Sequence, residues 1–192
     1  MGAHTRQTLL YHNTMHSRQI QCGRCSFVLP EGFIVQERAS YVNEHPSGSM
    51  HGIHGAKVPI CITLTSTAVH PGAPVFSLRP EDMNPDAYPV NITLTTLMAP
   101  SDVQPLDHLR KTADVLRRYY KGFEVSFCKR SRVGEYPAAR AQCSFVTNFK
   151  IFQLSIVWLV DKELVTCTMM VPESGVEKGW KDLRKFVDSI RL

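Results

Sequence analysis

Two apolar segments near the C-terminal end of the chain, separated by a polar pair of residues, constrain the fold most. Residues 149–160 and 164–171 are rich in aromatic and β-branched side chains, and Asp161-Lys162 stands between them. A connection this short joins antiparallel strands, because a parallel pair needs a crossover of about a dozen residues or more. The first segment is apolar on both faces, which is typical of a central strand covered on both sides.

The rest of the chain alternates between further strands and two amphipathic helices. The additional strands are predicted at 25–29, 34–41, 58–66, 90–97, 123–129 and 138–147. One helix is expected at 106–120, after Pro105, and Gly122 ends it. The second begins with the capping box Ser174-Gly-Val-Glu177. Its apolar face consists of Val176, Trp180, Leu183, Val187 and Ile190.

This order of elements predicts an α+β fold, an antiparallel β-sheet with helices packed on it. The chain has 192 residues, of which 43% are hydrophobic and 20% charged, as in a soluble globular domain. We expect a flexible polar leader at 1–18 and a single domain at 19–192. Long loops are expected at 43–57, rich in Gly, Ser and His, and at 67–89, which holds five prolines.

No apolar run approaches the length of a membrane span, and the first 20 residues lack the apolar stretch of a signal peptide. We therefore expect a cytoplasmic protein. Cys61, Cys128, Cys143 and Cys167 lie in apolar alternating segments, where they read as small buried hydrophobes and not as a disulfide framework.

The motif Cys22-Gly-Arg-Cys25 admits three interpretations. As a zinc site it would need two more ligands, which His51 and His54 of the following loop can supply. As a redox pair it should open a helix, whereas a strand follows here. The favoured interpretation is a hairpin in which the two cysteines face each other across a Gly23-Arg24 turn.

Other catalytic signatures are absent from the sequence. It contains neither a GxSxG elbow nor a glycine-rich phosphate loop of the GxGxxG or GxxxxGK[ST] type. We therefore expect a protein that is not an enzyme and needs no cofactor. A metal-binding or hydrolytic protein that uses Cys22, Cys25, His51 and His54 is the alternative.

Basic residues concentrate between positions 101 and 150, where ten Lys and Arg stand against five Asp and Glu. A nucleic-acid surface is one interpretation, but no RRM-type or KH-type signature supports it. A docking face for an acidic protein segment is at least as consistent with the pattern.

The strand at 149–160 suggests a binding surface of another kind. Its residues Phe152, Leu154, Ile156 and Trp158 belong either to an apolar sheet face that takes up a partner's hydrophobic helix or to the core behind that face. The exposed edges of such a sheet also make a homodimer plausible.

Several segments together resemble the DcrB-like family, which includes the Eag chaperones associated with type VI secretion effectors. They are FVLPEGF at 27–33, VNITLTTLMAP at 90–100, LRRYYKGFEV at 116–125, GEYPAARAQCSF at 134–145, IFQLSIVWLVDKELVTCTMMVPES at 151–174 and FVDSIRL at 186–192. The resemblance implies a fold related to the PsbP-like α/β sandwich. It also implies a non-catalytic protein that shields hydrophobic helices of an effector before secretion. Residues 1–18 and 41–89 depart from the family's pattern.

Overall fold

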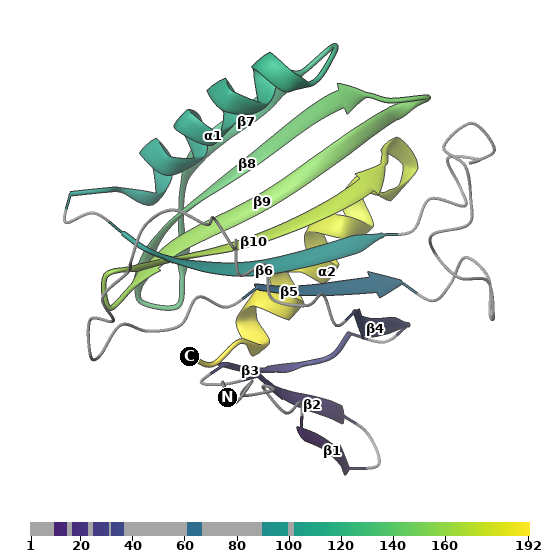
Figure 1. Ribbon diagram of the computed structural model, residues 1–192, viewed down its shortest axis with the longest axis vertical. Helices are drawn as coiled ribbons and strands as arrows, with labels where there is room; N and C mark the ends of the chain where they lie inside the picture. The colour runs from purple at the N-terminus through teal and green to yellow at the C-terminus, as the bar shows by residue number, and fades with distance from the viewer. Residues whose placement is uncertain are drawn as a thin grey trace, which may run out of the picture.

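The computed structural model describes residues 10–14, 17–22, 25–30, 32–36, 61–66, 90–99 and 102–192. In these ranges the strands form two antiparallel sheets (Figure 1). The smaller has the order β1-β2-β3, with β1 at Leu10–Thr14, β2 at Ser17–Cys22 and β3 at Cys25–Val28. The larger has seven strands in the order β4-β5-β6-β10-β9-β8-β7.

The strands of the larger sheet overlap the predicted segments, of which residues 37–41 and 58–60 lie outside the described ranges. They are β4 at Phe33–Gln36, β5 at Cys61–Ser66, β6 at Asn91–Met98, β7 at Glu124–Val133, β8 at Tyr136–Val146, β9 at Lys150–Val160 and β10 at Glu163–Pro172. All neighbouring strands pair antiparallel. Two α-helices pack on this sheet in the described ranges, so the predicted α+β class is confirmed.

The β9–β10 hairpin is the predicted one, and its turn geometry explains the polar pair. Asp161 and Lys162 both have positive φ values, 46° and 65°. Two consecutive positive φ values are the signature of a type I′ turn, whose twist matches that of the flanking strands. The register then places Val160 opposite Glu163 and continues to Ile151 opposite Pro172.

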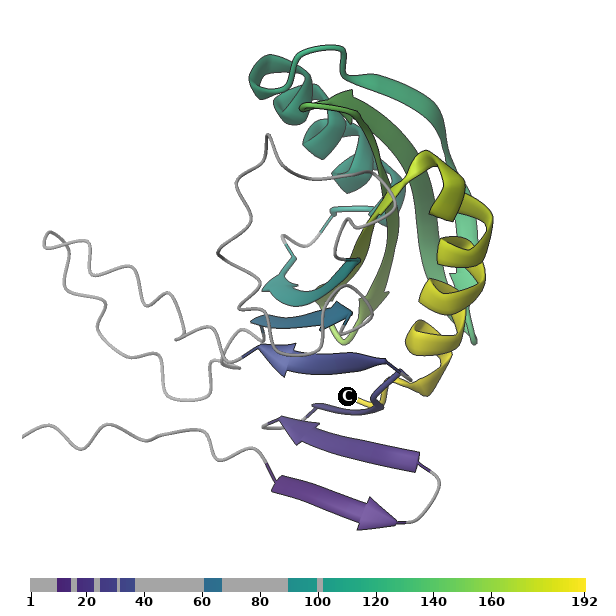
Figure 2. The same ribbon diagram turned by 90° about the vertical axis from the view of Figure 1, so that its right-hand side faces the viewer.

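The two helices lie on opposite faces of the large sheet (Figure 2). Helix α1, at Pro105–Tyr119, packs over β7, β8 and β9 and buries Leu109 and Ala113. Helix α2, at Val176–Ser189, packs over β9 and β10 and also contacts β3. Its buried face includes Leu183 and Val187, as expected, and also Phe186.

The predicted capping box at the start of α2 is wrong. A 3₁₀ turn at Glu173–Gly175 runs directly into the helix, and the backbone N–H of Val176 donates to the Glu173 carbonyl. Ser174 therefore lies inside this turn, and the helix begins without a side-chain cap. Glu177, the other half of the box, instead accepts a hydrogen bond from Lys181 at 2.8 Å.

Each helix covers its own hydrophobic core. The core under α1 includes Ala139, Cys143 and Val157. The larger core under α2 takes in β3 as well, through Cys25 and Phe27. The chain end fixes this arrangement, because Ser26 and Arg191 exchange two backbone hydrogen bonds of 2.8 Å.

Part of the predicted leader forms β1, which pairs with β2 in the register Leu10 opposite Gln21. The predicted loops at 43–57 and 67–89 lie outside the described residues. That residues 19–192 form one domain stays a prediction. In the described part of the chain, no helix combines the length and apolar character needed to cross a membrane.

Candidate protein-interaction surface

The four strand residues singled out in the sequence lie in the core and not on the surface. Their exposed fractions are 8% for Phe152, none for Leu154, 3% for Ile156 and 2% for Trp158. All four belong to the core under α2, because alternate residues of β9 point toward that helix. The sequence left two roles open for these residues, an apolar binding face or the core. In the structure they belong to the core.

The opposite face of the sheet has a different composition on β6 and β10. Helix α1 lies over β7, β8 and β9. Strands β6 and β10 therefore lie beside the helix and not under it. Register pairs Thr95 with Thr166 and Thr93 with Thr168. We call these four residues the threonine face. All four are half-buried, and each residue alternates along its strand with one that points into the core under α2.

Hydroxyl groups extend the threonine face onto β9. The hydroxyls of Ser155 and Thr168 lie 3.3 Å apart, and the Gln153 amide donates to Ser155 at 3.3 Å. A layer of methyl and hydroxyl groups of this kind accepts either apolar or polar contacts.

Two large apolar side chains lie exposed at the end of β6, Leu97 on the side of the threonine face and Met98 on the side of α2. Leu97 is 56% exposed and Met98 50% exposed. Leu97 shares its side of the sheet with Thr95 and stands opposite Leu164, which is buried in the core under α1. Ala99 follows, and its N–H donates to the Lys162 carbonyl at 2.8 Å. This bond fixes the end of β6 beside the β9–β10 turn.

The CxxC motif forms the predicted hairpin. Cys22 pairs directly with Cys25 in the antiparallel register of β2 and β3. The Cys25 side chain is fully buried in the core under α2. His51 and His54, the other two ligands of the alternative metal site, lie outside the described residues. Among the described residues, no group of three His, Cys, Asp or Glu side chains is placed to hold a metal ion.

In the large sheet and its helices, burial shifts the pKa values of Cys143, Cys167 and His108 in the direction that favours the uncharged form. Burial, together with the nearby Cys128, raises the pKa of Cys143 to about 11 from an ordinary 9.0, against an opposing effect of Arg117. Burial also raises the pKa of Cys167. For His108 on α1, burial and the neighbouring Lys111 lower the pKa. At neutral pH these groups are therefore uncharged, and the two thiols are poor nucleophiles.

The fold was compared with those of known proteins. No protein-family model matches the chain, and no curated protein matches it. Cyanobacterial PsbP (CyanoP) from Synechocystis is similar in structure, with a TM-score of 0.53 and 12% identity over 100% of this chain and 96% of that protein. The Ran-binding protein Mog1p of Saccharomyces cerevisiae has a TM-score of 0.52 and 15% identity over 93% of this chain and 96% of its own.

The chain has the PsbP-like fold. This agrees with the fold that the resemblance to the DcrB-like family implied, while membership of that family stays a prediction. At identities this low, the likeness concerns the arrangement of strands and helices and carries no residue roles.

Sequence reasoning missed the threonine face, although a signal for it was present. In β6, Thr93 and Thr95 alternate with the buried Ile92 and Leu94. This alternation indicates that one face of the strand is less apolar than the other. It does not indicate that α1 lies over the neighbouring strands and leaves this part of the sheet beside it, because helix placement is a tertiary property.

Proposed function

We propose that this chain is a non-catalytic domain that binds a hydrophobic helix of a partner protein on the threonine face. The observation that carries the proposal is the exposure of Leu97 at the end of β6, on the side of the sheet where no described helix lies over β6.

A helix suits this surface for a geometric reason. One helix, α1, lies over three strands of a seven-stranded sheet on this side. A second helix beside α1 would complete the layer over β10 and β6, as in two-layer folds that cover a sheet face with helices. An incoming amphipathic helix would bury Leu97 and Met170 and contact the threonine methyl groups.

The finer proposal is a chaperone or adaptor for a secreted effector that carries hydrophobic helices, acting in the cytoplasm. Two observations support it: the resemblance to the DcrB-like family, and the likeness in fold to Mog1p, a protein named for binding Ran. The likeness to Mog1p supports protein binding only, whereas the resemblance to the DcrB-like family indicates the kind of partner.

The experiment is co-expression of this chain with a soluble carrier protein that bears an N-terminal hydrophobic helix. We expect the two to elute together in size-exclusion chromatography. A Leu97→Asp variant should weaken the complex about tenfold or more, because a large apolar side chain contributes about 1.5–3 kcal/mol when buried. The matched control is Val115→Asp on α1, at a residue that is 49% exposed.

If the Val115→Asp variant loses the complex as fully as the Leu97→Asp variant, the binding surface is elsewhere and the proposal is wrong. Circular dichroism of each variant verifies that the fold is retained. Both altered sites are exposed, so neither substitution places a charge in a core.

A further inference from the structure

Among the described strands, β7 stands at one edge of the large sheet and pairs with β8 alone (Figure 1). It is ten residues long, and within the described part of the chain its segment 128–133 makes backbone hydrogen bonds with no strand but β8. An exposed edge of this length offers unpaired N–H and C=O groups to another chain.

The register identifies which residues offer these groups. Arg132 stands opposite Pro137, and proline has no N–H to donate. The Arg132–Pro137 pair is therefore a non-hydrogen-bonded pair of the ladder. By alternation Arg130 and Cys128 belong to such pairs too. These residues turn their own N–H and C=O groups away from β8, toward the free edge.

The same segment carries unbalanced positive charge on both faces. Arg130 and Arg132 lie on the side of α1, since Cys128 packs into the core under that helix. On the other face, Lys129 stands directly opposite Arg140. The ammonium of Lys129 lies 4.9 Å and the guanidinium of Arg140 5.9 Å from the centroid of the Phe127 ring.

Like charges opposite one another weaken a strand pair unless an anion relieves them. In the described residues, none of the six ion pairs of 4 Å or less involves Lys129, Arg130, Arg132 or Arg140. Arg132 donates to the backbone carbonyl of Glu135 at 2.8 Å, which leaves its charge unneutralised.

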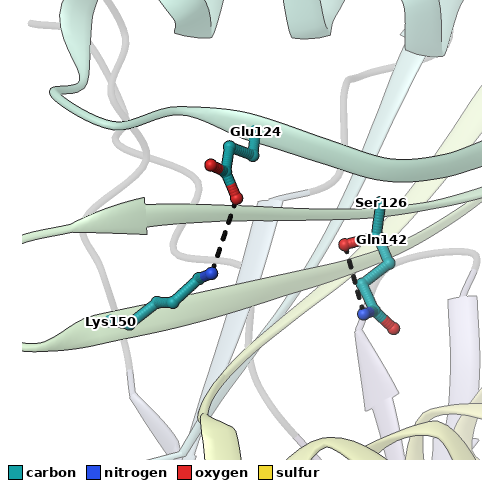
Figure 3. Close-up of polar contacts among 4 residues, drawn as sticks. All are labelled: Glu124, Ser126, Gln142 and Lys150. Carbon is teal, nitrogen blue, oxygen red and sulfur yellow. Dashed lines mark hydrogen bonds and ion pairs between the residues drawn. The ribbon is translucent and has the colours of Figure 1, made fainter.

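The first half of β7 is different. A bulge interrupts its pairing between Val125 and Phe127. Glu124 forms an ion pair of 3.5 Å with Lys150, across β8, and the Gln142 amide donates to the Ser126 hydroxyl at 3.4 Å (Figure 3). A bulge is a known means of blocking edge pairing. The regular, cationic half at 128–133 is therefore the part of the edge suited to a partner.

We propose that residues 128–133 of β7 dock an acidic polypeptide segment, which adds to the large sheet as an extended strand. Its side chains would alternate between Lys129 and Arg140 on one face and Arg130 and Arg132 on the other. A nucleic acid fits less well, because its phosphodiester backbone has no N–H to donate to the free carbonyls of the edge. The edge is separated from β6 by β8, β9 and β10, so this inference is independent of the proposed function.

The test is fluorescence anisotropy with a labelled peptide of consecutive glutamates, which presents carboxylates on both faces of an extended strand. The wild-type protein should bind it saturably, and Arg130→Ala/Arg132→Ala should weaken binding about tenfold or more. The matched control is Arg110→Ala/Arg117→Ala on α1, which removes two arginines that pair with Asp107 and Asp114. That variant should bind as the wild type does.

Strand addition is separated from charge attraction by comparing Arg130→Pro with Arg130→Ala. Both substitutions remove the charge, but only proline also removes the N–H that faces the free edge. The Arg130→Pro variant should therefore bind the peptide at least about threefold more weakly than the Arg130→Ala variant. If Arg130→Pro fails to fold, hydrogen exchange on the wild type replaces it, and the peptide should then slow exchange at the amides of Arg130 and Arg132. Four results would each overturn the proposal. They are absence of peptide binding, equal affinities of the two variants for the peptide, unchanged hydrogen exchange, and tighter binding of a single-stranded oligonucleotide of equal charge.

Discussion

The rings of Phe27 on β3 and Phe186 on α2 pack edge to face, with centroids 5.3 Å apart and an interplanar angle of 72°. Both side chains are among the fully buried ones. The contact joins a strand of the small sheet to the C-terminal helix, so the two ends of the described chain share one core.

Phe27→Ala and Phe186→Ala should each lower the free energy of unfolding by about 3–5 kcal/mol, from lost burial and the cavity left behind. The double variant should lose less than the sum, by about 0.5–1.5 kcal/mol, because the edge-to-face contact is removed only once. Urea denaturation measures all three. Val28→Ala, at an exposed neighbouring position, serves as the control and should change stability by no more than about 0.5 kcal/mol.

Gly179→Ala should destabilise the protein although alanine favours helices. A Cβ atom at Gly179 would lie 2.9 Å from Leu154 Cδ1 and 3.2 Å from Val171 Cγ1. Forcing α2 away from the sheet costs about 1–3 kcal/mol, against a gain in helix propensity of about 1 kcal/mol. Thermal unfolding measures the balance, with the exposed Lys185→Ala as a control. A higher melting temperature for Gly179→Ala would contradict the close packing described here.

Stability should fall as the pH rises above 9, in part through Cys143. Burial raises the pKa of its thiol to about 11, from 9.0 when unfolded. The folded state thus holds this proton more tightly. Its contribution is fully present below pH 9 and is lost as the pH rises toward 11. Cys143→Ala should make the decline between these values shallower. A variant whose pH profile is parallel to that of the wild type would show that the thiol does not contribute.

Purified protein should contain no stoichiometric zinc. Cys25 is buried beside Phe27 and pairs in register with Cys22, as a hairpin requires. Elemental analysis of the wild type and of Cys22→Ser/Cys25→Ser measures the metal content. About one zinc per chain, lost in the double variant, would instead favour the Cys2His2 site with His51 and His54.

The sequence predicts much of this fold because its signals are local. The β9–β10 hairpin follows from two apolar runs and a polar pair, and the apolar face of α2 follows from helical spacing. Strand β1 at Leu10–Thr14 was missed because its sequence, LYHNT, is largely polar and lacks alternation. The capping box at Ser174 failed because a 3₁₀ turn, which spacing alone does not reveal, precedes the helix.

The candidate interaction surface was harder to predict than the fold. Phe152, Leu154, Ile156 and Trp158 have the composition of a binding face, but α2 covers them. Exposure at Leu97 depends on where α1 and the β9–β10 turn lie, and this is fixed by contacts distant in sequence. The positive charge of residues 129–132 was visible in the sequence. Its position at an edge of the sheet could be learned only from the strand order.

The most direct test of the proposed function is photo-crosslinking in the native cell. A benzophenone amino acid replaces Leu97 in one variant and Val115, of similar exposure, in another. We predict that Leu97 crosslinks to a discrete partner protein through one of its hydrophobic helices, and that Val115 does not. The same crosslinked products from both positions, or a crosslink from Leu97 to this chain alone, would contradict a helix-binding surface at the threonine face.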